Sequence, residues 1–313
     1  MYGKMFLASL TLVVAACAAS VANEAEQSPP QHPADQQVFL DTCEAWDEWD
    51  KPAPPFKIHG NTYYVGTCGI AAILIADNGG HTLIDTGTEK GAEIVLANIR
   101  SLGFDPTDVE TLLMSHEHFD HVGGMAFLQA ETGAQVYASP DAALVMMLSG
   151  VPMQDDPQFG MHDPMKTVSR VMILKGKDQV WDEVVDFYHL ENVGFELRAA
   201  RTPGHTPGAL SWQWESCEGA DCLTIVFADS LSPVSSDEYR FSDHPEYLAE
   251  YYAGLERLGQ LECDILLTPH PSHSKMLKRM ESGTLEGGLN CPAYAAGKLK
   301  DIDNALAKEA ASQ

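Results

Sequence analysis

One short stretch, residues 115–121, constrains this chain more than any other. It reads Ser-His-Glu-His-Phe-Asp-His, so imidazoles and carboxylates crowd into adjacent positions. Buried polar side chains this close need a positively charged partner between them, and neutral imidazole and carboxylate are good zinc ligands. The alternative is a solvated polar loop, but His and Asp rarely cluster so tightly without a metal. The stretch therefore predicts a metal site and a fold that can present one.

The flanking sequence predicts a strand before this cluster and a helix after it. Residues 109–114 form an apolar run typical of a buried strand, and residues 122–125 open a helix. In an extended loop, residues two apart point the same way, so we expect His116 and His118 to hold one ion and Asp120-His121 to reach a second. Ligands at the carboxyl end of a strand are typical of α/β proteins.

The rest of the chain alternates between strand and helix patterns, and its 45% hydrophobic content suffices for a sizeable core. Helices are expected around residues 95–102, 140–148, 243–258 and 299–306. Further strands are expected at residues 61–65, 70–75, 81–84, 134–138, 195–200, 209–214, 223–227 and 263–268.

Two histidines far from the cluster complete the candidate ligand set. His205 stands in the turn Thr-Pro-Gly-His-Thr-Pro-Gly, whose Gly and Pro residues fix its geometry. His270 directly follows the apolar strand at 263–268. A lone His is more often structural, but each metal needs three protein ligands and the cluster alone supplies too few for two ions.

The N-terminus reads as an export signal. An apolar segment of signal-peptide length at residues 5–16 is too short to span a membrane, and cleavage could follow the small residues at 20–22. Alternatively, Val-Ala-Ala-Cys at 14–17 is a lipoprotein processing sequence, which would attach a lipid anchor to Cys17. We therefore predict a periplasmic protein whose chain divides into a signal peptide (1–22), a flexible leader (23–37) and a single folded domain (38–313).

The cysteine content agrees with export. Removal of Cys17 with the signal leaves an even number of cysteines, which suits disulfides in an oxidising compartment. Sequence alone leaves the pairing open. Pairing of neighbours in chain order is favoured, which would join Cys43 to Cys68, Cys217 to Cys222 and Cys263 to Cys291.

The charge of the chain excludes some classes of partner. The formal net charge is −26, from 19 basic and 45 acidic residues. Nucleic acid binding requires clustered Lys and Arg, so the balance argues against it. It also disfavours anionic lipid surfaces.

These motifs together resemble the metallo-β-lactamase superfamily. The order His-x-His-x-Asp-His at 116–121, then His205, then His270 matches that family across nearly the whole mature chain. Within the superfamily the chain is most similar to subclass B3. The segment Ala-Asp-Ser-Leu-Ser at 228–232 has serine where other lactamase subclasses place a ligand cysteine, and Leu-Leu-Thr-Pro-His-Pro around His270 is similar to that subclass.

The resemblance implies a fold, a metal content and an activity. The implied fold is an αββα sandwich of the α/β class, with two mixed sheets flanked by helices. The implied activity is hydrolysis of the β-lactam amide bond of penicillins, cephalosporins and carbapenems by a metal-bound hydroxide, which confers antibiotic resistance. The protein would act as a monomer. Carried over residue by residue, two zinc ions would be held by His116, His118 and His205 and by Asp120, His121 and His270.

The resemblance also assigns roles around the metals. Asp120 would orient the hydroxide and relay a proton, and Ser230 and Ser232 would bind the substrate carboxylate.

Two further residues near the site each have two alternatives. Phe159, in a loop at 152–165, either belongs to a flap over the site or packs into the core. Asp85 either braces the metal ligands or caps the following turn.

Some assignments stay open at this stage. Asp229 could bridge both metals, as an Asp does in glyoxalase-type members, although the adjacent serines favour the lactamase assignment. We expect His273 at the surface or at the start of a helix. The alternatives to a β-lactamase are another exported dinuclear zinc hydrolase, such as a lactonase or thioesterase, and a non-catalytic zinc-binding protein.

Overall fold

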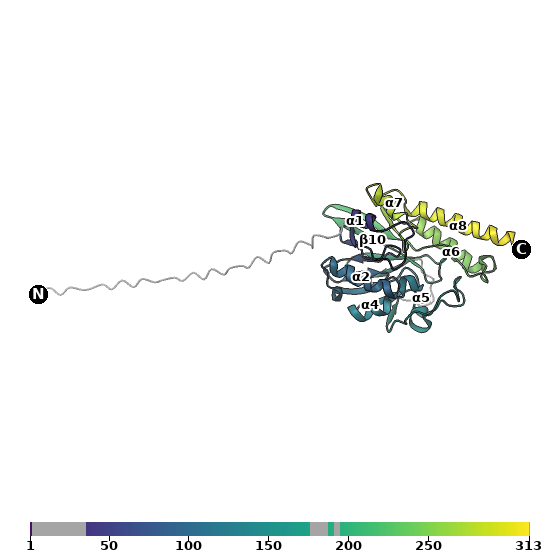
Figure 1. Cartoon of the computed structure of the whole chain (residues 1–313), viewed down its shortest axis with the longest axis horizontal. Coiled ribbons are helices and arrows are strands. Elements are labelled where there is room, and N and C mark those ends of the chain that lie inside the picture. Colours follow the sequence, from purple (N-terminus) through teal and green to yellow (C-terminus); the bar gives the residue numbers. More distant parts are fainter. Residues whose placement is uncertain (2–35, 176–186, 191–194, 313) are drawn as a thin grey trace. The chain divides into compact units, whose positions relative to one another are not determined.

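The structure is a computed structural model that describes Met1 and residues 36–175, 187–190 and 195–312 (Figure 1). Apart from Met1, the predicted signal peptide, Cys17 and most of the predicted leader lie outside the described residues. The last two leader residues, Gln36 and Gln37, are described and begin helix α1 (Gln36–Thr42). Helix α1 therefore starts two residues before the predicted domain boundary at residue 38.

Two mixed β-sheets form the centre of the domain, as predicted. In the first, seven-stranded sheet, neighbours from β1 to β4 pair antiparallel and those from β4 to β7 pair parallel. In the second, five-stranded sheet, β11 and β12 pair parallel and the other neighbours pair antiparallel. The first sheet contains β1 (Phe56–His59), β2 (Thr62–Tyr64), β3 (Ile73–Ile75), β4 (His81–Ile84), β5 (Val109–Leu113), β6 (Gln135–Ala138) and β7 (Val171–Ile173). The second contains β8 (Phe187–Leu190), β9 (Leu197–Arg201), β10 (Leu210–Glu218), β11 (Asp221–Phe227) and β12 (Ile265–Leu267).

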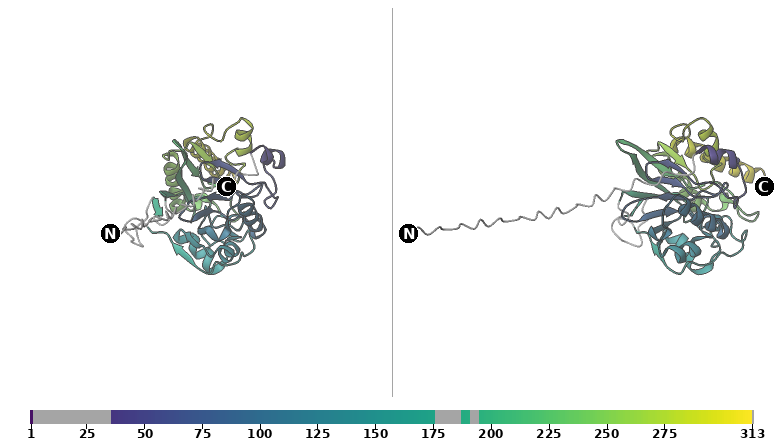
Figure 2. Two further views of the ribbon diagram at one scale, coloured as in Figure 1. Left: turned by 90° about the vertical axis from the view of Figure 1, so that its left-hand side faces the viewer. Right: turned by 60° about the vertical axis from the view of Figure 1, so that its left-hand side comes forward.

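Helices cover both outer faces of the sheet pair. Figures 1 and 2 show α2, α4 and α5 on one side and α6, α7 and α8 on the other. No helix in the described part of the chain has the length and apolarity to cross a membrane. The remaining helices are α2 (Glu89–Ser101), α3 (Phe119–Val122), α4 (Met125–Thr132), α5 (Pro140–Leu144), α6 (Pro245–Gly259), α7 (Met276–Glu281) and α8 (Cys291–Ala311), with short turns η1 (Pro106–Asp108), η2 (Val145–Ser149) and η3 (Phe241–Asp243).

Alternation along β11 shows how the second sheet joins two apolar layers. Ile225 and Phe227 belong to the core between the sheets, whereas Val226 belongs to the layer with Tyr251 of α6 and Tyr294 of α8. Successive side chains of a strand point to opposite faces, so a strand buried on both sides reads as a continuous apolar run. Complete burial of each such large side chain stabilises the fold by about 1.5–3 kcal/mol.

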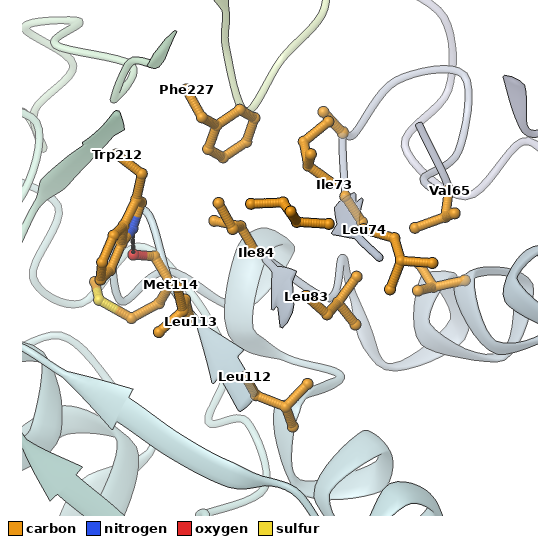
Figure 3. Close-up of a cluster of buried hydrophobic side chains, with 14 of the residues drawn as sticks. Val65, Ile73, Leu74, Leu83, Ile84, Leu112, Leu113, Met114, Trp212 and Phe227 are labelled. Atoms are coloured by element: carbon orange, nitrogen blue, oxygen red, sulfur yellow. Dashed lines mark hydrogen bonds between the residues drawn. The ribbon is translucent and has the colours of Figure 1, made fainter. Parts of the chain in front are cut away.

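The core between the sheets also holds the segment that carries the histidine cluster. Ile73 and Ile84 of the first sheet face Phe227 and Trp212 of the second (Figure 3). The indole Nε1 of Trp212 donates a hydrogen bond to the carbonyl oxygen of Met114 at 2.8 Å, drawn as a dashed line in Figure 3. The next carbonyl, that of Ser115, accepts from Leu210 N at 2.7 Å. The chain leaving β5 is thus fixed to β10 just before His116.

The described residues contain three disulfides, and these join the cysteines in chain order. Cys217 and Cys222 lie opposite each other across the β10–β11 hairpin. The third disulfide ties the segment before β12 to the first residue of α8. The pairs are Cys43–Cys68, Cys217–Cys222 and Cys263–Cys291.

Several elements differ from the sequence prediction. The strands β1, β7 and β8 and the helix α7 were not predicted, because three to six residues are too few to establish a period. Strand β10 runs four residues beyond its predicted end at 214, since its outer half is half-exposed and polar and gives no apolar signal.

Candidate metal centre

The predicted ligands gather at one edge of the sandwich, in loops at the carboxyl ends of strands. The cluster at 116–121 follows β5, and His270 follows β12. His205 lies in the turn between β9 and β10. Gly204 shapes that turn: it adopts φ +155°, and a Cβ there would lie 2.4 Å from the ring of Tyr251. The turn therefore requires glycine beside His205.

Three histidines form the first donor group. One ring nitrogen from each of His116, His118 and His205 lies within 4.8 Å of the other two. All three residues are buried, with at most 6% of their surface exposed. This is the ligand number and chemistry that a zinc ion requires.

Protein partners orient two of these rings. The Nδ1 of His116 lies 2.9 Å from Asp229 Oδ1, and His205 Nδ1 donates to the carbonyl oxygen of Ser232 at 2.8 Å. The Nε2 of His116 is buried and has no hydrogen-bond partner among the described residues. An unsatisfied buried nitrogen costs about 1–3 kcal/mol, whereas a metal ion would use its lone pair, so the residues fit a bound metal.

A second donor group lies beside the first. The Oδ2 of Asp120 is 3.1 Å from His121 Nε2 and 3.4 Å from His270 Nε2, and the two nitrogens are 3.3 Å apart. Burial alone would raise the pKa of Asp120, but His121 and His270 hold it well below its usual range. The rings of His116 and His121 have centroids 4.2 Å apart. The six predicted ligands therefore form two adjacent groups of three.

Asp85 braces this second group. Its buried carboxylate accepts hydrogen bonds from Ser115 N at 2.6 Å and Ser115 Oγ at 2.7 Å. It also lies 3.5 Å from His121 Nδ1. Asp85 holds φ 62°, a strained conformation for a non-glycine residue that these contacts stabilise. Its side chain therefore contacts the start of the cluster instead of capping the turn that follows it.

Glu117 points away from the two donor groups. Along an extended segment, the residue between His116 and His118 faces the opposite side. Its carboxylate accepts hydrogen bonds from Thr206 Oγ1 at 2.7 Å and Gly208 N at 2.9 Å. Burial raises the pKa of Glu117 to about 8. This buried acid links the cluster to the turn that carries His205.

Comparison with known proteins agrees with this geometry. The sequence profile of the metallo-β-lactamase superfamily matches residues 65–215. The solved structure of the MIM-2 metallo-β-lactamase is 52% identical, with a TM-score of 0.78 over 87% of this chain and 97% of that one. The structure of MEM-A1, a subclass B3 metallo-β-lactamase from a soil metagenome library, is 35% identical, with a TM-score of 0.78 over 85% and 100% of the two chains. The chain belongs to the metallo-β-lactamase superfamily, and it resembles subclass B3.

Further relatives match over unequal lengths. The metallo-β-lactamase MIM-1 from Novosphingobium pentaromativorans is 42% identical, with a TM-score of 0.79 over 88% of this chain and 99% of that one. Ribonuclease TTHA0252 from Thermus thermophilus is 35% identical over 111 residues, which are 34% of this chain and 25% of that protein. A hydroxyacylglutathione hydrolase from Albidiferax ferrireducens is 39% identical over 64 residues, or 20% of this chain and 23% of that protein. The chain thus spans about a quarter of these two curated relatives.

Asp229 lies behind the first donor group of this metallo-β-lactamase. It is fully buried, and its Oδ2 accepts a hydrogen bond from Leu231 N at 3.0 Å while Oδ1 faces His116 Nδ1. A carboxylate in this position fixes the tautomer and orientation of the imidazole. The geometry favours this positioning role over a carboxylate that bridges two ions.

The two predicted carboxylate-binding serines differ in accessibility. Ser230 has no exposed surface, and its Oγ has no hydrogen-bond partner in the described part of the chain. Ser232 is half-buried, and its Oγ accepts a hydrogen bond from Lys298 Nζ at 2.8 Å. A substrate can therefore reach Ser232 directly, whereas contact with Ser230 requires the segment to shift.

The loop at 152–165 contains two site residues that the sequence does not reveal. Asp156 and Gln158 are buried. Asp156 Oδ2 lies 3.2 Å from His118 Nε2, and Gln158 Nε2 lies 3.4 Å from His205 Nε2. Phe159 is 48% exposed, so of its two alternatives the one in which it packs into the core is wrong. Residues 156–158 form a buried run flanked by exposed residues, and a loop sequence alone does not reveal which residues face the metals.

His273 also differs from its expected position at the surface. It is half-buried, and its ring centroid lies 5.0 Å from that of His270 and 5.6 Å from that of Trp46. Its Nδ1 is buried without a hydrogen-bond partner among the described residues. His273 is therefore part of the wall of the site.

Two cavities adjoin the donor groups. One, of about 440 Å³, is lined by Phe119, Met161 and His162, and the His162 ring lies 5.9 Å from that of His118. The other, of about 530 Å³, is lined by residues that include Ser232 and His273. Each donor group of the metal centre thus has a cavity beside it.

Proposed function

We propose that this protein hydrolyses the amide bond of β-lactams at a centre of two zinc ions. The convergence of six donors into two adjacent groups carries the proposal, because two metals can act together on one carbonyl. The similarity to metallo-β-lactamases over nearly the whole domain supports the substrate class. Penicillins, cephalosporins and carbapenems are the proposed substrates, and resistance to them is the proposed consequence.

The first ion would be held by the three histidines of the first group and the second by Asp120, His121 and His270. Bound zinc supplies Lewis acidity and activates water at neutral pH. Asp229 and Asp85 fix the rings of His116 and His121, so the donors are oriented before substrate arrives.

Asp120 is the proposed catalytic acid–base group. In the overall reaction, a water oxygen bonds to the lactam carbonyl carbon, the C–N bond breaks and the ring nitrogen takes a proton. One carboxylate oxygen of Asp120 faces His121 and His270, which leaves the other to orient the water and hold its proton. A carboxylate with a low pKa stays ionised at neutral pH and can accept these hydrogen bonds.

The substrate would lie across the metal centre between the two cavities. An apolar side chain of the substrate can contact Phe119 and Met161 in one cavity, and the carboxylate that these substrates carry can contact Ser232 in the other. Ser230 remains a proposed second contact. Phe159 is proposed to contact substrate from the loop rim, where it is exposed.

The deciding experiment is hydrolysis of a penicillin and a carbapenem by purified, zinc-loaded protein, with and without a chelator. Turnover that is lost on chelation and restored by zinc is expected, with two zinc ions per chain by metal analysis. Absence of turnover with two zinc ions bound would overturn the proposal and point to a lactone or thioester substrate.

We also propose that the protein is exported to the periplasm as a monomer. The three disulfides support an oxidising compartment. The mass of the mature protein tests the route: loss of residues 1–22 indicates ordinary cleavage, whereas an acylated Cys17 indicates a lipid anchor. If a lipid anchor forms at Cys17, the Cys17→Ala variant should lose its membrane-bound fraction. If no anchor forms there, that fraction should stay unchanged.

A further inference from the structure

The cavity lined by Ser232 and His273 beside the metal centre contains a cation that the steps above do not use. Lys298 lies on α8 and is only 8% exposed, although most lysines of a folded protein are exposed. Its Nζ donates to Ser232 Oγ at 2.8 Å. Tyr294 of the same helix presents its ring 5.3 Å from Nζ. Burial of an ammonium group is costly unless it serves an anion.

The protein itself provides few hydrogen-bond acceptors for this ammonium group. A lysine has three N–H donors, and Ser232 Oγ is the hydrogen-bond acceptor that the described residues provide within normal distance. The nearest carboxylate oxygen, from Asp301, is 4.0 Å away, and its side chain is 54% exposed. Because its ion pair with Asp301 is long and exposed on the carboxylate side, the buried lysine leaves a positive site inside the cavity of a chain whose net charge is −26.

Ser232 connects this cation to the reaction centre. Its carbonyl oxygen accepts from His205 Nδ1, and its hydroxyl accepts from Lys298. The ring of His273, which lines the same cavity, lies 5.0 Å from that of His270 of the second donor group, at an interplanar angle of 50°. An anion held between Lys298 and Ser232 would therefore lie beside both donor groups.

We propose that Lys298, together with Ser232, binds the carboxylate of the substrate and so determines which substrates are recognised. This inference rests on the proposed function. The competing explanation is structural, with Lys298 serving only to fasten α8 to the segment at 228–232. That explanation predicts a loss of stability without a preference between charged and neutral substrates.

The test compares Lys298→Met, which keeps the chain length of the side chain but removes its charge, with Lys298→Arg and with a control. Lys300→Met is the matched control, because Lys300 is exposed and lies two residues away on the same helix. Each zinc-loaded variant is assayed with a β-lactam carboxylate and with the methyl ester of the same compound, and its zinc content and Tm are measured.

For Lys298→Met we expect KM for the carboxylate to rise about tenfold or more, because one hydrogen bond to a charged group is lost. The kcat, the zinc content and the KM for the ester should change little. Lys298→Arg should restore part of the effect, and Lys300→Met should match the wild type. Equal changes with carboxylate and ester, or a fall in Tm as the main effect, would overturn the proposal.

Failure of the proposed function gives a different result. If the zinc-loaded wild type hydrolyses neither compound, calorimetry then measures binding of the intact carboxylate to the wild type and to Lys298→Met. Binding that is weaker in the variant supports the anion site for some other carboxylate, whereas equal binding, or none to the wild type, refutes it.

Discussion

The buried link between Glu117 and the turn carrying His205 allows a quantitative prediction. Replacing Glu117 with Ala removes both acceptors used by Thr206 Oγ1 and Gly208 N. Both donors lie against a fully enclosed carboxylate, so water does not replace the lost group. A change that only removed surface charge would have no such effect.

The magnitude follows from the two unsatisfied donors. Each costs about 1–3 kcal/mol when buried, giving about 2–6 kcal/mol together. Part of this is offset because a carboxylate no longer has to be buried, the same desolvation that raises the pKa of Glu117 to about 8. We expect a net loss of about 2–4 kcal/mol in the free energy of unfolding, or roughly 4–8 °C in Tm for a domain of this size.

Glu117→Gln distinguishes the contribution of the hydrogen bonds from that of the carboxylate charge. The amide keeps an oxygen for Gly208 N–H and presents an NH₂ group that can donate to the Thr206 hydroxyl, so its cost should stay below about 1.5 kcal/mol. Urea unfolding of the metal-free proteins, with disulfides intact, measures both variants. Glu131→Ala is the control, since Glu131 is exposed on α4.

Zinc competition with a chromophoric chelator provides a second measurement. Loosening the link between the two ligand segments should weaken zinc at the first group by about tenfold in Glu117→Ala, as loss of a positioning contact does elsewhere. An unfolding free energy within about 0.5 kcal/mol of wild type, the range of a neutral surface change, would refute the reasoning.

Three further predictions concern the surroundings of the metal centre. Asp229→Asn should weaken zinc binding by about 10–100-fold, because it removes the carboxylate that orients His116; chelator competition measures this, and wild-type affinity would contradict it. Replacing Cys263 and Cys291 together with Ser should cost about 2–4 kcal/mol, seen as a lower urea midpoint than wild type under oxidising conditions. Burial lowers the pKa of Lys298 to about 8, so its charge is present below that pH and lost above it. KM for a carboxylate substrate should therefore rise above about pH 8, and Lys298→Arg should abolish that rise; a flat profile in the wild type would argue against it. Among the described residues, the charged or titratable groups near Lys298 include Asp301 and Tyr294 of α8, Asp229 after β11 and His273 before α7.

The ligand set is predictable from sequence because residues with metal-binding side chains directly follow predicted strands. The cluster at 116–121 ends a buried strand, and His270 does the same after β12. The carboxyl ends of neighbouring strands meet at one sheet edge. Residues as far apart in the chain as His121 and His270, which are 149 positions apart, are therefore expected in one site. The apolar residues that end β5 and β11, at 112–113 and 225–227, likewise indicate burial of both faces of these strands at that end.

The residues that the sequence does not reveal act through tertiary contacts. Asp156 and Gln158 stand in an irregular loop, where no period indicates which side chains turn inward. Lys298 occupies a helix whose other lysines are exposed, and only the packing of α8 against the segment at 228–232 distinguishes it. Glu117 lies between two ligands in the sequence, although strand-like alternation turns it to the opposite side.

The loop at 152–165 has an inner side that contacts the metal centre and an outer side that is exposed to solvent. Its inward residues, Asp156 and Gln158, contact candidate ligands, so their replacement would disturb the metal centre itself. Met153, Phe159 and Met161 point outward and are 41–48% exposed. Exposed substitutions usually alter stability by less than about 0.5 kcal/mol. Substitutions on the outer side of the loop can therefore accumulate at little cost to folding, and under the proposed function a change of substrate range should begin there.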